Sequence, residues 1–165
     1  MKRLSDPPLI KVYEALSAVG SGRVKILGEG RAKVLSSSRD KIYDVYWSDD
    51  LREFNSNDNG TYWRGYVGYP IIAVLMSLNL IDSADVASKI LADVAWKHLN
   101  DENHNDYQKV IDAVLAGMSH AQRHSVQEAV RRAQEQLYAL KLWTLTDRSF
   151  KGAAAKNDGE MSGWT

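Results

Sequence analysis

The sequence predicts an α+β fold with an N-terminal helix, a small antiparallel sheet of three to four strands, and then about four helices packed on one side. Alternating patterns typical of strands are confined to about residues 20–60, and helical spacing of apolar residues dominates about 70–146. Strands in one run and helices in another disfavour the alternating order of a parallel sheet. We expect a single domain over residues 1–150 and a tail over 151–165.

Composition restricts the classes of protein that the chain can represent. The 165 residues are 44% hydrophobic, which is enough for a core, and they include no cysteine. Disulfides, thiol catalysis, zinc ribbons and iron–sulfur clusters are therefore excluded. The longest apolar stretch, at 70–76, is too short to cross a bilayer, and the first residues do not form a signal peptide. We expect a soluble cytoplasmic protein with no membrane partner.

The first helix is predicted after Asp6, which can cap it, because Pro7 suits a first helical position. Gly20 and Gly22 mark its end. Its apolar face at helical spacing consists of Leu9, Val12, Tyr13, Leu16 and Val19.

Two basic octapeptides follow, because Gly-x-Gly-Arg-x-Lys-x-Leu occurs at 20–27 and again at 28–35. Their alternation predicts two strands, and the intervening Gly28-Glu29-Gly30 is typical of a hairpin turn. "KIYDVYW" at 41–47 and "REFNS" at 52–56 are the expected third and fourth strands.

The helical half begins with a short apolar helix from Pro70 to about Leu78. A second helix is expected from Asp82 to about Leu99, followed by a polar loop over 100–106 and a third helix over about 106–117. The last helix is expected to start at a capping box formed by Ser125 and Glu128.

The basic hairpin is the first candidate binding site. Its strand pairing places the basic side chains on one face, where aromatic side chains of the third strand can stack on bases. The proposed nucleic-acid contacts are Arg23, Lys25, Arg31, Lys33, Tyr43 and Trp47. The simpler alternative is a solvated outer face. Residues 1–45 carry a charge of +4, from 9 basic and 5 acidic residues, whereas the acidic residues of 46–112 oppose a polyanion.

An aromatic segment at 61–70 is the second candidate, because Tyr62, Trp63, Tyr66 and Tyr69 can line a ligand cleft. The alternative is that they pack between the sheet and the helices and hold the two together. We favour this packing role, which predicts that Trp63 is buried and that Trp63→Ala lowers the free energy of unfolding by about 3–5 kcal/mol.

Catalytic and metal motifs are weak. The Rossmann and P-loop glycine patterns and Gly-x-Ser-x-Gly do not occur, so we expect no cofactor. His120 and His124 are four residues apart but lack the glutamate of His-Glu-x-x-His, and we expect no bound metal. A polar cluster near the 100–106 loop consists of His98, Asp101, Glu102, His104 and Asp106.

These observations favour a small intracellular, non-enzymatic binding protein, and contact with nucleic acid through the hairpin 23–35 is the most specific hypothesis for its role. One alternative is a small metal-dependent enzyme using the His, Asp and Glu residues around 98–106. The other is a structural or self-association module, and the sequence permits a homo-oligomer.

Overall fold

The computed structural model describes residues 1–146 and Trp164, so the expected tail lies, apart from Trp164, outside the described residues. In chain order the elements are α1 (Ile10–Gly20), β1 (Val24–Gly28), β2 (Arg31–Leu35), β3 (Ile42–Trp47), β4 (Glu53–Ser56), α2 (Asn59–Tyr62), α3 (Tyr69–Ser77), α4 (Asp85–Ile90), α5 (Trp96–Glu102), α6 (Tyr107–Ala116), α7 (His120–Leu140) and β5 (Trp143–Thr144). The α+β class is confirmed. None of the helices in the described part is long and apolar enough to span a membrane.

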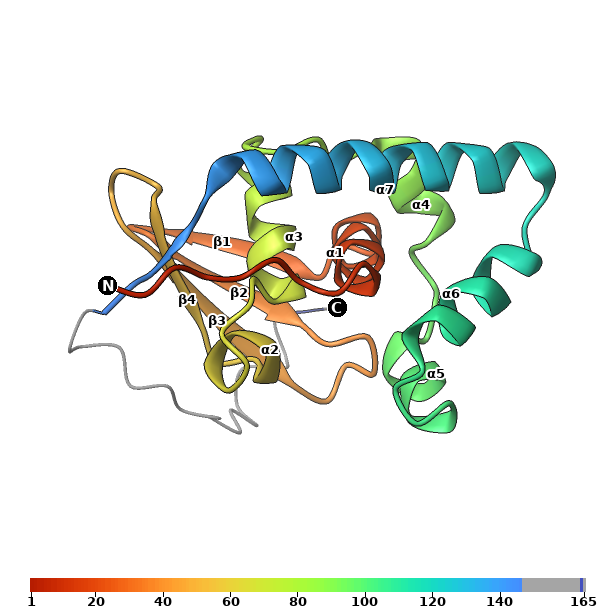
Figure 1. Cartoon of the computed structure of the whole chain (residues 1–165), viewed down its shortest axis with the longest axis horizontal. Helices are drawn as coiled ribbons and strands as arrows, with labels where there is room; N and C mark the ends of the chain where they lie inside the picture. Colours follow the sequence, from red (N-terminus) through yellow and green to blue (C-terminus); the bar gives the residue numbers. More distant parts are fainter. Residues whose placement is uncertain (147–163, 165) are drawn as a thin grey trace.

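The sheet has five strands in the order β1-β2-β3-β4-β5, one more than the predicted maximum. The first four form an antiparallel meander, and β5 pairs parallel to β4. Trp143 donates its backbone N–H to Arg52 O, and Leu4 donates to Leu142 O, so residues 142–144 lie between β4 and the N-terminal segment (Figure 1). A strand of two residues has no alternation to detect, which is why the sequence did not reveal it.

The predicted hairpin and its turn are confirmed. Val24 pairs with Val34 and Lys25 with Lys33. Gly28 and Gly30 both have positive φ, which glycine adopts at little cost. A Cβ at Gly30 would lie 2.6 Å from the carbonyl oxygen of Trp47, so the close approach of β3 also requires glycine here.

Helices cover one face of the sheet (Figure 1). Val34, Val45 and Phe54 point from the inner face and are fully buried. They pack beneath α3, whose apolar residues 70–76 are all buried, and α1 lies beside α3. The long helix α7 contacts α1 and α4, while α5 packs on α6 on the far side of α1 from the sheet.

Three helix boundaries differ from the prediction. The first helix begins at Ile10 rather than after Asp6, with no side-chain cap. The expected second helix divides into α4 and α5, because turns between Leu91 and Trp96 interrupt it, and α5 extends into the expected polar loop. In all, six described helices follow β4, including the single turn α2, compared with about four expected.

The last helix starts one turn and a half before the predicted capping box. Ser119 caps α7 by accepting from Gln122 N, while the Gln122 side chain accepts from Ser119 N. The prediction at Ser125 and Glu128 is therefore wrong. Both tetrapeptides fit the Ser-x-x-Glu/Gln pattern, and the sharp turn after α6 selects the earlier one.

Candidate functional site

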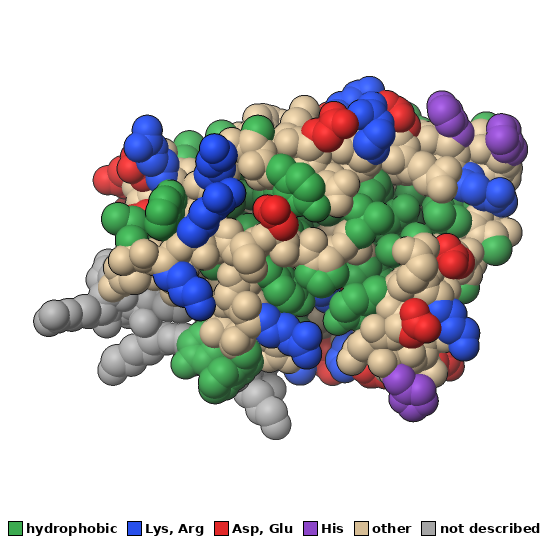
Figure 2. Space-filling view, viewed as in Figure 1, with side chains coloured by type: hydrophobic (Ala, Val, Ile, Leu, Met, Phe, Trp, Pro, Cys, Tyr) green, Lys and Arg blue, Asp and Glu red, His purple; other side chains and the backbone are tan. Residues whose placement is uncertain are grey.

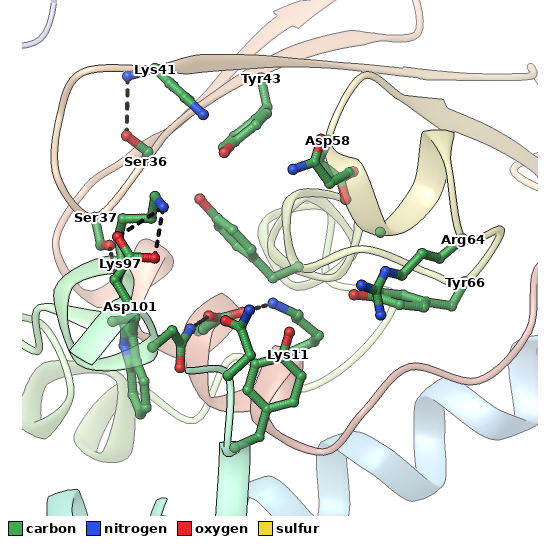
Figure 3. A pocket seen from close by; sticks show the side chains of 18 of the residues that line it. Lys11, Ser36, Ser37, Lys41, Tyr43, Asp58, Arg64, Tyr66, Lys97 and Asp101 are labelled. Carbon is green, nitrogen blue, oxygen red and sulfur yellow. Dashed lines mark hydrogen bonds and ion pairs between the residues drawn. The ribbon is translucent and has the colours of Figure 1, made fainter. Parts of the chain in front are cut away.

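A polar cavity of about 240 Å³ opens where α1, α2, α5, the turn between β2 and β3, and the start of α3 meet (Figure 3). The side chains that shape it come from segments between Lys11 and Tyr107. Lys97 N donates to Ser37 Oγ at 3.0 Å, which ties α5 to the β2–β3 turn across the cavity. The site therefore depends on the packing of the sheet against two separate helical segments.

The floor of the cavity contains a buried carboxylate, Glu14 of α1. Its Oε1 accepts from Asn100 Nδ2 at 2.9 Å, and its Oε2 lies 2.9 Å from Lys11 Nζ. The Lys11 ammonium also lies over the ring of Tyr107, 5.1 Å from the centroid. Glu14 raises the pKa of Lys11 against the opposing effect of burial, so the Lys11 ammonium keeps its proton in the interior.

Arg23, just before β1, is a buried cation held by neutral groups. Arg23 is only 3% exposed. The guanidinium donates to Ser21 Oγ, Leu35 O and Ser17 Oγ, at 2.7, 2.9 and 3.3 Å. None of the described carboxylates forms an ion pair with it. Burial lowers the pKa of Arg23 from its ordinary value, yet a guanidinium remains charged at neutral pH.

The cavity has an excess of positive charge. Its lining carries five cationic and three acidic side chains, a balance of +2: Lys11, Arg23, Lys41, Arg64 and Lys97 against Glu14, Asp58 and Asp101. Lys97 pairs with Asp101 at 3.0 Å. Lys41 and Arg64 make no ion pair with any described residue, and the Lys41 amine points into the opening (Figure 3). Positive charge that is not neutralised internally favours a negatively charged ligand.

Two tyrosines line the cavity wall toward the sheet. The rings of Tyr43 and Tyr69 meet edge to face, with centroids 5.9 Å apart. Burial raises the pKa of Tyr43 to about 12, and the carboxylates of Asp58 and Glu14 act in the same direction. Burial likewise raises the pKa of Tyr69 well above its ordinary value. Both phenols therefore keep their protons at neutral pH and are available as hydrogen-bond donors.

Three buried polar atoms at the cavity have no hydrogen-bond partner in the described part of the chain: Asp58 Oδ2, Asn100 Oδ1 and Trp96 Nε1. Asp58 and Asn100 are 6% and 7% exposed. A buried polar group without a partner costs about 1–3 kcal/mol, so native proteins rarely contain three around one cavity without a reason. These atoms make the cavity a candidate binding site.

Two glycines position the wall that contains Asp58. A Cβ at Gly68 would lie 2.2 Å from Asp58 Oδ1, and a Cβ at Gly60 would lie 2.3 Å from the ring of Tyr66. Thr61 N donates to Asp58 Oδ1 at 3.0 Å and orients the carboxylate. Glycine at these two positions lets the carboxylate and the phenol approach the backbone closely enough to face the cavity.

The buried phenols predict a loss of stability in alkali. Unfolded tyrosine ionises near pH 10, whereas folded Tyr43 holds its proton to about pH 12. Rising pH between these values therefore favours the unfolded chain. Tyr43→Phe is expected to reduce the loss of unfolding free energy between pH 9 and 11 by about 1 kcal/mol, measured by urea denaturation. Tyr138→Phe, on the more exposed face of α7, is the control, and equal losses in the two variants would contradict the prediction.

The aromatic segment divides between the cavity and the surface. Tyr66 and Tyr69 line the cavity, as the cleft hypothesis proposed. Tyr62 and Trp63 do not line it, and they stack edge to face on the outside of α2, where hydrophobic side chains project from the surface (Figure 2). Trp63 is 77% exposed, so the prediction that it is buried is wrong. Its position at the end of a single helical turn leaves no element to cover it.

The hairpin residues do not share one exposed face. Lys25 and Arg31 are exposed on the outer face of the sheet, and Lys33 beside them pairs with Asp44 at 2.9 Å. The expectation is wrong for Arg23, which lies in the joint between α1 and β1. Tyr43 and Trp47 alternate in phase with the buried Val45 and so belong to the inner face, where Trp47 stacks on Phe54. Tyr46 is the aromatic residue beside Arg31, 5.8 Å from the guanidinium.

The acidic and histidine cluster is dispersed along α5 and the following turn. His98 and Glu102 contact each other at 3.0 Å on the exposed side of α5, whereas Asp101 lines the cavity. His120 and His124 both lie in α7, contrary to the predicted helix start between them. Within residues 1–146 and Trp164, no group of three His, Cys, Asp or Glu side chains could hold a metal ion.

Sequence reasoning missed most of the cavity. Glu14 was the one available signal on α1, because it is an acidic residue among the apolar positions of "VYEAL". Asp58 was read as part of a turn, and Asn100 as part of a loop. Neither has a local pattern that distinguishes a buried acceptor from a solvated one, because their burial comes from segments distant in the chain.

Comparison with known proteins gives one match. No curated protein and no solved structure matches the chain. A family model, described as "Uncharacterised conserved protein UCP014422", matches residues 4–143, which include every residue that lines the cavity. Since the match covers well over half of its length, the chain belongs to the family of uncharacterised conserved protein UCP014422.

Proposed function

We propose that the protein binds a small anionic molecule in the cavity between the sheet, α1, α2 and α5. The observation that supports this most directly is the combination of unneutralised cations with buried polar atoms that lack partners. Arg23 is buried without a carboxylate, and Lys41 and Arg64 stand at the opening without one. A ligand with an acidic group would neutralise them and exclude water from the interior.

The shape of the site favours a small molecule over a polymer. Its volume of about 240 Å³ lies just below the usual range for small-molecule pockets, about 300–1,000 Å³. Tyr43, Tyr69 and Trp96 supply flat apolar surface, and their polar ends supply donors that orient a ligand. We propose binding without a reaction, because the charges and hydrogen-bonding groups of the lining suit the binding of an anion.

The proposal is tested by measuring the binding of ethyl phosphate and propionate by isothermal titration calorimetry. Lys41→Gln and Arg64→Gln are each expected to weaken the binding of at least one anion by about three- to ten-fold, because each removes one charged contact. Affinity is also expected to fall between 50 and 500 mM NaCl, since salt screens charges at an open rim.

Lys25→Gln is the matched control, because it removes the same charge from the outer face of the sheet. It is expected to leave anion affinity unchanged. Absence of binding by the parent protein, or an equal loss in Lys25→Gln, contradicts the proposed function.

The nucleic-acid hypothesis remains a separate prediction for the outer face. Lys25, Arg31 and Tyr46 form its remaining exposed or partly exposed group. The same Lys25→Gln variant, combined with Arg31→Gln, tests it through salt-sensitive binding of single-stranded oligonucleotides. A cytoplasmic location and a homo-oligomer also remain predictions from the sequence.

A further inference from the structure

The cavity offers a ligand both cations and hydrogen-bond acceptors, and the two kinds of group are interspersed around it (Figure 3). On one side Arg23 donates to Leu35 O, and the adjacent Ser36 accepts from the backbone of Lys41. On the opposite side Asp58 lies near Arg64 and Tyr66, and Asn100 lies in the floor beside Glu14 and its partner Lys11. A ligand that fills the cavity therefore meets both cations and unpartnered acceptors.

The acceptors are not satisfied by the protein. Asp58 Oδ1 accepts from Thr61 N, but Oδ2 accepts from no described residue. Asn100 uses its amide N–H to reach Glu14, and this leaves Oδ1 without a donor. A simple anion cannot donate a hydrogen bond to either atom, and its charge is repelled by the Asp58 carboxylate. A ligand with N–H or O–H groups near these two atoms removes both the cost of the unpaired acceptors and the repulsion by Asp58.

We propose that the ligand carries an acidic group at one end and a hydrogen-bond donor group at the other. The acidic group faces Arg23 and Lys41, and the donor group faces Asp58 and Asn100. Phosphorylated polyols, aminophosphates and amino acids share this chemistry. The inference rests on the proposed function and extends it from a small anion to a small anion with donors.

A matched set of probes separates the two ideas. Ethyl phosphate has the acidic group alone, glycerol phosphate adds hydroxyl donors, and phosphoethanolamine adds an ammonium donor. Propionate and β-alanine make the same comparison for a carboxylate. We expect at least one donor-bearing probe to bind about ten-fold or more tightly than its donor-free counterpart, because hydrogen bonds to a charged, buried acceptor are strong. The probe that gains affinity shows whether the donor is a hydroxyl or an ammonium group, and whether the acid is a phosphate or a carboxylate.

Asp58→Asn locates the donor contact. Asparagine keeps the capping oxygen for Thr61 N but replaces the free acceptor with an N–H₂ group. The variant is expected to lose the preference for the donor-bearing probe while retaining or improving affinity for its donor-free counterpart. Asp112→Asn, the same change at an exposed carboxylate of α6 that does not line the cavity, is expected to keep the preference.

The outcomes are distinguishable. If donor-free and donor-bearing probes bind the parent protein with equal affinity, the inference is wrong while the proposed function stands. The same conclusion follows if Asp58→Asn keeps the full preference. If no probe binds, the proposed function fails, and the inference fails with it. The comparison of probes on the parent protein requires no variant, so it holds even if Asp58→Asn does not fold.

Discussion

Trp96→Ala is expected to lower the free energy of unfolding by about 3–5 kcal/mol, because it removes one of the largest fully buried side chains. Trp96 is 1% exposed and packs on the ring of Tyr13, with centroids 6.1 Å apart. It also joins α5 to α1 at the cavity, where no other aromatic ring of α5 can replace it. Urea denaturation followed by circular dichroism measures the change.

Trp63→Ala is the matched control, and it removes the same side chain from the exposed side of the molecule. We expect a change within about 0.5 kcal/mol, in contrast to the value expected from the sequence. If the two variants unfold at the same urea concentration, the placement of α5 against α1 is wrong.

Gly20→Ala is expected to destabilise the fold by about 3 kcal/mol, although alanine is the better helix former. A Cβ at Gly20 would lie 1.8 Å from the carbonyl oxygen of Ser88. That oxygen belongs to the backbone of α4, which can yield only by moving the whole helix away from α1. A thermal melt and urea denaturation report the loss.

The control for Gly20 is Gly117→Ala at the end of α6. A Cβ there meets only the Val114 carbonyl oxygen, at an ordinary 3.7 Å. We expect it to be neutral or to stabilise by up to about 1 kcal/mol. If Gly20→Ala and Gly117→Ala have the same melting temperature, the close contact between α1 and α4 is wrong.

The residues 20–56 show what the sequence by itself determined. Alternation, β-branched residues and the Gly28-Glu29-Gly30 turn act between neighbours in the chain, so they specify β1 to β4 and their pairing. The apolar run at 70–76 equally specified a buried helix. The order of a strand run before a helix run then determined the α+β class.

Tertiary packing decided the features that depend on distant segments. The sequence predicted a capping box at Ser125, whereas the turn after α6 places the start of the helix at Ser119. The two-residue β5 exists because β4 and the N-terminal segment offer hydrogen bonds to it. Trp63 and Trp96 are each followed by a basic residue in the sequence, yet the packing buries only Trp96.

The cavity is wholly one of the features that tertiary packing decided. The sequence singled out four of its residues, Arg23, Tyr43, Tyr66 and Tyr69, as binding candidates, but assigned the first two to an exposed basic face and the others to a separate aromatic segment. It could not show that Glu14, Asp58 and Asn100 meet them in one interior space. A side chain's charge is a property of the sequence, whereas its desolvation and its missing partners depend on the segments folded around it. The candidate site is defined by that difference: charges and acceptors that would be ordinary in solvent are buried here without the groups that would satisfy them.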